Sequence, residues 1–175
     1  MNKLNNVDLE KIKGIIEKWK TDQSVLKKKM SIKGEWNLAE GPQFKINLKY
    51  EKGETTLNID SPSFMGGEGQ APSPLQICLS GLVSCFAGTL ASIAAEKGIE
   101  LEKLEVGAEA SYDFSKTFGL SNNPIANGVT FTVDIKAKNA NDNQINEIIK
   151  EAEERCPAMF CLKNPIPVSV NVSRS

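Results

Sequence analysis

The sequence contains no histidine among its 175 residues. This absence excludes Ser-His and Cys-His nucleophile pairs, imidazole metal ligands and histidine-ligated haem. Arginine is nearly absent as well, since only Arg155 and Arg174 occur. Any chemistry that this chain performs must therefore use other groups.

Cysteine is also scarce, and the four that occur are Cys78, Cys85, Cys156 and Cys161. They are too few and too clustered for the disulfide framework of a small secreted protein, which leaves thiol chemistry, metal binding or plain core filling. As a set they lack the paired spacing of structural zinc sites, so no metal site is expected. The first residues lack the apolar segment and cleavage site of an export signal, and we expect a cytoplasmic protein.

The composition is otherwise that of a soluble globular protein, with 40% hydrophobic and 25% charged residues. The length suits one domain with its own hydrophobic core. Charge is unevenly distributed, because residues 1–30 carry eight lysines against four acidic residues. This excess is small for nucleic-acid binding and few aromatic residues accompany it, which favours a solvated helix face over an anionic partner.

Residues 6–30 show the three- and four-residue spacing of apolar side chains that predicts an amphipathic helix. The apolar positions are Ile12, Ile15, Ile16, Trp19, Leu26 and Met30. Asn5 and Asn6 stand where residues that cap a helix start are preferred. We therefore expect one continuous helix over this segment.

Alternating apolar residues over 32–38, 44–50 and 55–59 predict three strands that form an antiparallel meander. Residues 61–74 are rich in glycine and proline and predict a loop. Residues 69–95 contain no charged side chain, and their apolar residues lie on every side of a helical wheel. Such a helix is buried in a protein or in lipid. Polar interruptions and the lack of a second span favour a buried central helix over a membrane span.

Two further alternating segments, 104–114 and 129–137, predict strands. Asn141 and Gln144 have the spacing of a capping box at the start of a second amphipathic helix, which Pro157 closes. Residues 166–172 predict a last strand. This order of elements predicts an α+β fold in which an antiparallel sheet packs with a long buried central helix.

Cys85 lies in the middle of the predicted central helix, where core filling is the ordinary role of a cysteine. A stripe of small residues lets another backbone approach this helix closely; it comprises Gly81, Ser84, Gly88 and Ser92. Cys78 lies two turns before Cys85, about 10 Å away along the axis, which is too far for a disulfide. Cys156 ends the next helix, and the electronegative helix end suits a resolving thiol better than an attacking one.

The run GGEGQAPSPLQICLSGLVSCFAGTL, followed by AEERCP at residues 152–157, resembles the osmotically inducible protein C (OsmC) and organic hydroperoxide resistance (Ohr) family. The resemblance covers residues 31–175, and residues 1–30 look like an additional N-terminal helix. It implies an OsmC-like fold and an intertwined homodimer. It also implies two redox-active cysteines, which match Cys85 and Cys156.

The chemistry implied by this resemblance is that of a cysteine-based, peroxiredoxin-type peroxidase of the oxidative stress response. Cys85 attacks an organic hydroperoxide, releases an alcohol and becomes a sulfenic acid, with which Cys156 condenses to a disulfide. The uncharged surroundings of Cys85 suit an apolar hydroperoxide. A dithiol reductant such as a lipoyl protein then restores both thiols, and no bound cofactor is needed.

The sequence departs from the family pattern at two positions. Peroxidase members place an arginine from the early strands over the thiolate and hold it with a glutamate at the start of the central helix. Here no arginine precedes Arg155, and Gln76 stands at the position of the glutamate. The lysines available as substitutes are Lys33, Lys45, Lys49 and Lys52. Without a nearby cation, burial is expected to raise the pKa of the Cys85 thiol.

Two alternative functions follow from the same residues. An OsmC-like scaffold without peroxidase activity would bind an apolar small molecule in the cavity between subunits. A thiol–disulfide redox partner of another protein is the other alternative, and replacement of Cys156 by serine would trap its mixed disulfide. Neither nucleic acid nor a membrane span is expected in any of these functions.

Overall fold

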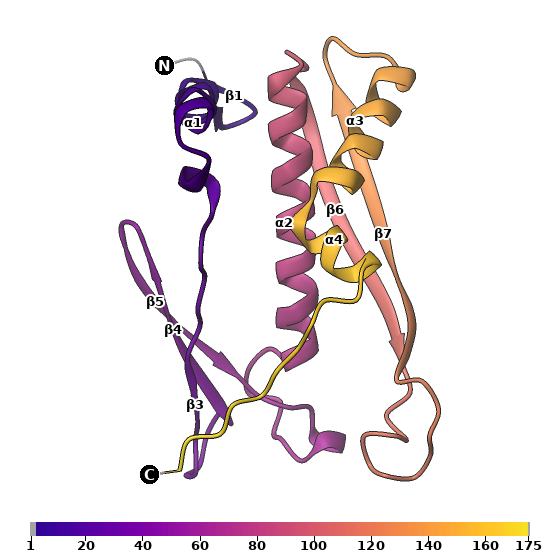
Figure 1. The fold of residues 1–175 in the computed structure, drawn as a ribbon. Coiled ribbons are helices and arrows are strands. Elements are labelled where there is room, and N and C mark those ends of the chain that lie inside the picture. The colour runs from indigo at the N-terminus through magenta and orange to yellow at the C-terminus, as the bar shows by residue number, and fades with distance from the viewer. Residues whose placement is uncertain (1–2, 175) are drawn as a thin grey trace. The chain divides into compact units, whose positions relative to one another are not determined.

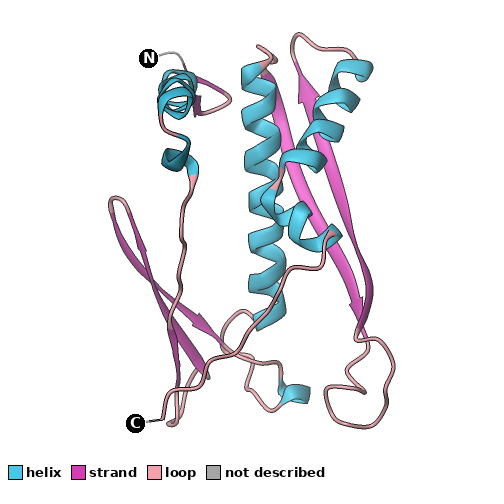
Figure 2. Cartoon of the chain, viewed as in Figure 1, coloured by secondary structure: helices cyan, strands magenta, loops and turns pink. Residues whose placement is uncertain are grey.

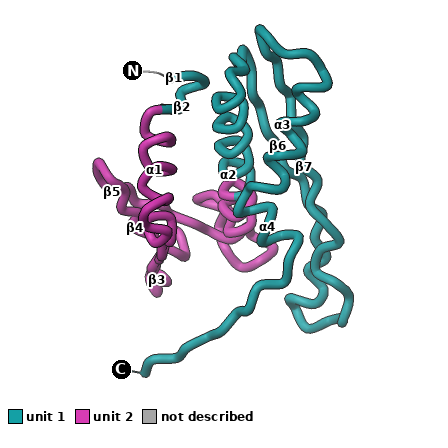
Figure 3. Tube along the Cα trace, turned by 45° about the horizontal axis from the view of Figure 1, so that its top comes forward, with its two compact units in different colours: residues 1–9, 82–175 teal, residues 10–81 magenta. Residues whose placement is uncertain are grey.

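A computed structural model describes residues 3–174 of the chain. It divides into two compact units (Figure 3). Unit 1 comprises residues 1–9 and 82–175, and unit 2 comprises residues 10–81. The sequence predicts instead an N-terminal extension of residues 1–30 followed by one domain of residues 31–175. These two units do not test that division, which stays a prediction.

The chain begins with a short hairpin rather than with the predicted helix. β1 (Lys3–Leu4) pairs with β2 (Val7–Asp8) in an antiparallel manner. Asn5 and Asn6 form the turn with φ angles of 53° and 61°, a left-handed conformation that asparagine tolerates. The side chain of Asn5 accepts from the Leu101 N–H (2.9 Å) and donates to the Ile99 carbonyl (2.8 Å). The prediction that these asparagines cap a helix is therefore wrong, because they form a tight turn instead.

The helix of this region, α1, covers Leu9–Thr21 only. A 3₁₀ turn, η1, follows at Gln23–Leu26, and the Asp22 side chain caps it by accepting from the Ser24 N–H at 2.9 Å. Residues 27–33 have no regular structure. The prediction of one helix over 6–30 is thus wrong beyond Thr21, because Asp22 takes an extended conformation and its side chain competes for backbone N–H groups.

The predicted meander of unit 2 is confirmed. β3 (Gly34–Trp36), β4 (Phe44–Tyr50) and β5 (Gly53–Ile59) form one antiparallel sheet in the order β3-β4-β5. Phe44 is the partner of Trp36 on one side and of Ile59 on the other. The first strand is shorter than the predicted 32–38.

A closed loop leads from β5 to the long helix. It contains a 3₁₀ turn, η2 (Ser63–Met65), and is organised by Asp60, which is 2% exposed. Asp60 Oδ2 accepts from the backbone N–H groups of Glu68 (3.1 Å) and Gln70 (2.9 Å). Gly67 packs so close to the Ser61 carbonyl that no Cβ would fit there, which explains the glycine at this position.

α2 (Pro74–Glu96) is the long helix of the chain (Figure 1). Gly98 terminates it with φ 71°, as the sequence predicts. Its buried residues all lie in the second half: Phe86, Leu90, Ile93, Ala94 and Ala95. Only 22% of its most apolar stretch is buried in the described chain, and it is the one described helix long and apolar enough to cross a membrane. Burial on every side is therefore contradicted for the described chain, because the first half of α2 contains no buried residue.

Unit 1 contains the main core. β6 (Leu101–Tyr112) and β7 (Ala126–Ala137) pair as a long antiparallel hairpin. α3 (Asp142–Arg155) begins with the predicted capping box of Asn141 and Gln144, and α4 (Pro157–Lys163) follows directly. Figure 2 shows α3 and α4 on the same side of this hairpin as the second half of α2. The core cluster comprises Phe86, Leu90, Ile93, Ala94, Ile99, Ile148, Ala152, Cys156 and Met159.

The predicted last strand, residues 166–172, does not form in the described chain. Val168, Val170 and Val172 alternate as a strand would, but they are 85%, 86% and 78% exposed. A strand is stabilised by hydrogen bonds to a neighbouring strand. The pattern is present in the sequence, but no strand pairs with this segment among residues 3–174.

Candidate functional site

The two cysteines that the sequence singles out lie side by side. The Sγ atoms of Cys85 and Cys156 are 3.7 Å apart, within the range of a thiol–sulfur hydrogen bond. Cys85 is half-buried on α2, directly before the buried Phe86. Cys156 is completely buried. Both residues belong to unit 1, so their proximity is a property of that unit's core.

The helix α3 delivers Cys156 through its apolar stripe. Ile148 and Ala152 are fully buried and precede Cys156 at intervals of one helical turn. The Cys156 N–H still donates to the Ala152 carbonyl at 2.9 Å, so Cys156 ends α3. It also forms the N-cap of α4, with Pro157 at the first helical position. Pro157 therefore closes one helix, as predicted, and opens a second one.

Ion pairs hold the end of α3 against the end of α2. The guanidinium of Arg155 donates to Glu96 at 3.1 Å and 3.4 Å and to Glu151 at 2.8 Å. Lys97 also pairs with Glu151, at 3.0 Å. Arg155, although adjacent to Cys156 in sequence, thus directs its charge to carboxylates and joins the two elements that carry the cysteines.

Burial raises the pKa of the Cys85 thiol above its usual range. The backbone N–H of Ala158, in the first turn of α4, donates to Cys85 and acts in the opposite direction. The neighbouring Cys156 thiol adds to the increase, and Cys161 contributes in the same sense. This direction agrees with the sequence-based expectation that burial raises the pKa of the Cys85 thiol.

The remaining predicted site residues lie in unit 2. Lys33 precedes β3 and Lys49 lies on β4, and both are exposed. Gln76 Oε1 accepts from the Ser73 N–H at 2.8 Å, while the Gln76 N–H donates to Ser73 Oγ at 3.3 Å. This reciprocal pair begins α2, and the Ser-x-x-Gln spacing of residues 73–76 is the sequence signal for it. A supporting role of Gln76, Lys33 or Lys49 at Cys85 stays a prediction.

Cys78 and Cys161 are exposed. Cys78 lies in the first half of α2 and Cys161 on α4. Within residues 3–174, no group of three or more histidine, cysteine or acidic side chains is arranged to hold a metal ion.

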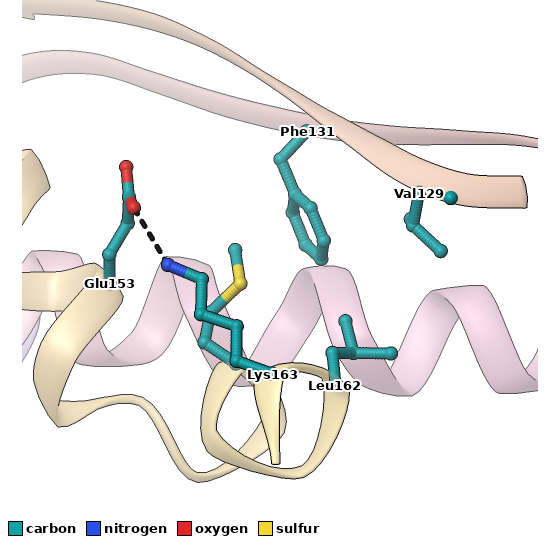
Figure 4. Close-up of a pocket in the computed structure, with 7 residues that line it drawn as sticks. Val129, Phe131, Glu153, Leu162 and Lys163 are labelled. Carbon is teal, nitrogen blue, oxygen red and sulfur yellow. Dashed lines mark hydrogen bonds and ion pairs between the residues drawn. The ribbon is translucent and has the colours of Figure 1, made fainter.

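An apolar hollow of about 430 Å³ lies between β7 and α4 (Figure 4). Val129, Phe131, Met159 and Leu162 line it, and a Glu153–Lys163 ion pair of 3.0 Å lies at one side. Sequence reasoning did not identify this hollow, since its residues come from separate elements. Neither cysteine lines the hollow, but two of its residues belong to the packing around the pair. The ring of Phe131 meets that of Phe86 edge-on at a centroid distance of 5.6 Å, and Met159 belongs to the same core cluster as Cys156.

Two thiols at this distance can interconvert with a disulfide. The S–S bond is about 2.05 Å long, and the two sulfur atoms are 3.7 Å apart. A shift smaller than one atomic diameter therefore brings them to bonding distance. When one of the two cysteines has already been oxidised to a sulfenic acid, the second thiol condenses with it to the disulfide and water is released. The geometry is therefore suited to two-electron redox chemistry.

Comparison with known proteins identifies the family. The family model described as OsmC-like protein matches residues 67–171, which include both cysteines of the pair. The organic hydroperoxide resistance protein of Xanthomonas axonopodis pv. citri is 23% identical over 116 residues, which is 66% of this chain and 77% of that protein.

Solved structures agree on the fold. The OsmC like protein from Mycoplasma pneumoniae has a TM-score of 0.58 and 24% identity, and the match covers 79% of this chain and 89% of that one. An organic hydroperoxide resistance protein OsmC from Legionella pneumophila has a TM-score of 0.54 and 19% identity over 77% of this chain and 90% of that one. The predicted α+β fold with antiparallel sheets is thereby confirmed. Because the family match spans more than half of the sequence, the chain belongs to the OsmC-like protein family.

Proposed function

We propose that this protein is a thiol-dependent peroxidase that reduces organic hydroperoxides through Cys85 and Cys156. The observation that carries the proposal is the 3.7 Å contact between the two sulfur atoms, one half-buried and one completely buried. The name of the Xanthomonas relative, an organic hydroperoxide resistance protein, points to the same class of substrate.

In the first step the Cys85 thiolate attacks the distal oxygen of the hydroperoxide. An S–O bond forms, the O–O bond breaks, and the leaving alkoxide takes up a proton and departs as the alcohol. The sulfur loses two electrons and the peroxide gains them, which leaves Cys85 as a sulfenic acid. The Ala158 N–H, which donates to Cys85, stabilises negative charge on the attacking sulfur.

In the second step the Cys156 sulfur attacks the sulfenic sulfur of Cys85. The S–S bond forms, the S–O bond breaks, and hydroxide leaves with the thiol proton as water. Complete burial of Cys156 fits a resolving thiol, because this residue never has to meet the peroxide. An external dithiol, such as a lipoyl group, then reduces the disulfide by two thiol exchanges and is itself oxidised to a disulfide. Such intracellular reductants fit the cytoplasmic location that the sequence predicts.

The apolar hollow supports an apolar hydroperoxide as substrate. Its walls are hydrocarbon, an aromatic ring and a thioether, from Val129, Leu162, Phe131 and Met159. Such a surface binds hydrogen peroxide weakly, because hydrogen peroxide has no apolar part to bury. An alkyl or aryl tail would be buried against it and would contribute binding free energy.

A homodimer is part of the proposal. The first half of α2 is poorly buried although it is apolar, and the exposed valines of residues 168–172 lack a partner strand in the described chain. A second copy would cover both features. The family resemblance implies this type of intertwined assembly.

The second candidate is a scaffold that binds an apolar small molecule without catalysis. The raised pKa of Cys85 favours it, because a protonated thiol is a poor nucleophile, and the hollow would hold the ligand. Native mass spectrometry of the purified protein checks this candidate through a bound molecule that denaturation releases.

The deciding experiment measures dithiol oxidation driven by cumene hydroperoxide, with dihydrolipoamide as the reductant. We expect turnover by the unmodified protein, none above background for Cys85→Ser, and full turnover for the exposed-thiol control Cys78→Ser. Equal rates for the unmodified protein and Cys85→Ser would refute the peroxidase proposal.

A further inference from the structure

The helix α1 has a regular arrangement of charge around its axis. At about 100° per residue, its apolar side chains gather on one face, namely Ile12, Ile15, Ile16 and Trp19. The lysines occupy both borders of this face, and they are Lys11, Lys13, Lys18 and Lys20. The centre of the opposite face carries the acidic residues, Glu10 and Glu17. Positive charge therefore flanks the apolar face and the acidic residues lie on the opposite side, although Lys20 on one border also pairs with Glu17 at 2.6 Å.

The apolar face is only partly covered in the described chain. None of the residues of α1 is buried: Ile12 and Ile15 are half-buried, and Ile16 and Trp19 are 44% and 41% exposed. The segment that follows has the same character, since three consecutive lysines at 27–29 precede Met30 and Ile32, which are 91% and 72% exposed. A solvated face, which the sequence alone favours, explains the lysines but leaves the exposed apolar side chains without a role.

An anionic lipid surface would bind both the flanking lysines and the exposed apolar side chains of α1. Lysines at the border of an apolar face extend their amines to the headgroup level while their methylene chains lie along the acyl boundary. Tryptophan is enriched at that same boundary. Acidic residues at the far side of the helix remain in water, where they are not repelled by anionic headgroups. Nucleic acid would use the positive charge but gains nothing from an apolar face.

We propose that α1, with residues 22–32, forms an amphipathic arm that lies in the plane of an anionic lipid bilayer. The apolar face enters the boundary between headgroups and acyl chains, and the flanking lysines bind the anionic headgroups. This is peripheral attachment and involves no membrane span. It is independent of the cysteine chemistry, although an arm of this kind would bring the protein to the apolar compounds of a membrane.

Vesicle binding by the full-length protein tests the proposal. The chain has two tryptophans, so a Trp36→Phe background leaves Trp19 as the only indole reporter. We expect co-sedimentation with phosphatidylcholine vesicles that contain phosphatidylglycerol, and a blue shift of the Trp19 emission. With pure phosphatidylcholine, or at high salt, we expect binding to fall at least about tenfold, because the lysines then lose their attraction to the anionic surface.

Matched charge reversals separate the arm from general surface charge. Lys13→Glu with Lys20→Glu changes two lysines of the α1 border, and we expect it to weaken binding to the anionic vesicles at least about tenfold. The control is Lys116→Glu with Lys150→Glu, which changes two exposed lysines of unit 1 and is expected to leave binding unchanged. Equal losses in both pairs would overturn the proposal, as would equal binding to both types of vesicle. Loss of self-association in Trp19→Ser, together with no vesicle binding by the parent protein, would assign the face to a second copy instead.

Discussion

The sulfur atoms of Cys85 and Cys156 lie 3.7 Å apart although 71 positions separate the residues in the sequence. Three features accompany this contact: the buried second half of α2, the apolar stripe of α3, and the ion pairs of Arg155 with Glu96 and Glu151. The contact is therefore built into the core of unit 1 and needs no rearrangement of the fold.

Replacement of Cys156 separates attack from resolution. After one equivalent of hydroperoxide, mass spectrometry should find the unmodified protein lighter by two hydrogens and Cys156→Ser heavier by one oxygen. Excess peroxide should then convert Cys85 of the variant to sulfinic acid, because no buried thiol is left to condense with the sulfenic acid. Cys161→Ser is the control and should still form the Cys85–Cys156 disulfide. An oxidised product in Cys156→Ser that is identical to that of the parent would contradict this assignment.

The raised pKa of Cys85 predicts how its reactivity depends on pH. The thiolate is the reactive form, and burial keeps the pKa above the ordinary value of 9.0. The alkylation rate of Cys85, obtained as the part of the total rate that is lost in Cys85→Ser, should therefore increase from neutral pH and still be rising at pH 9. A plateau of this rate below pH 8 would mean that a cation stabilises the thiolate in the working protein.

The core of unit 1 is expected to be sensitive to truncation at Ile148. This side chain is completely buried between α3 and the rest of the core cluster, so Ile148→Ala should lower the free energy of unfolding by about 2–5 kcal/mol. Ile32→Ala, at a position that is 72% exposed, should change it by no more than about 0.5 kcal/mol. Urea denaturation followed by circular dichroism measures both. Similar small values for the two variants would count against the described packing.

The exposed valines near the C-terminus predict a dependence of assembly on this segment. Val168→Asp with Val170→Asp places charge on the apolar side of the alternating pattern, and we expect it to abolish the dimer by preventing strand addition. Asn171→Asp, on the other side of the same pattern, serves as the matched control. Sedimentation velocity gives the mass of each species. A monomeric parent protein, or a dimer in all variants, would refute the role of these valines.

Asp60 is expected to hold the loop that precedes α2. Hydrogen bonds from the backbone N–H groups, of Gln70 above all, lower the pKa of this carboxyl below its usual value. The carboxylate therefore stabilises the fold above the ordinary pKa, and this contribution is lost as the pH falls through the lowered value. Asp60→Asn should increase amide hydrogen exchange at Glu68 and Gln70 at neutral pH, with little change in β4. Unchanged exchange at both residues would show that the loop does not depend on Asp60.

Local structure was largely determined by the sequence. Period-two alternation located β4 within its observed limits, Phe44–Tyr50, and the spacing of Asn141 and Gln144 located the start of α3. These signals depend on neighbours a few residues apart, so they can be read without the fold. The same local reasoning failed after Thr21. The apolar spacing predicts that the helix continues there, but the Asp22 side chain caps a separate 3₁₀ turn. It failed also at Asn5 and Asn6, which form a turn.

The cysteine pair shows what the sequence predicts and what only the packing in three dimensions decides. The sequence, through its likeness to a family, predicted Cys85 and Cys156 as a redox pair, but only the packing of α3 with α2 brought their sulfur atoms to 3.7 Å from each other. The apolar hollow and the carboxylate partners of Arg155 were decided in the same way. Alternating valines at 168–172 encode a strand, yet a strand forms only where another offers its hydrogen bonds. Residue spacing thus determined what each segment can become, and contacts between distant segments decided what it does, because burial and pairing are properties of neighbours in space.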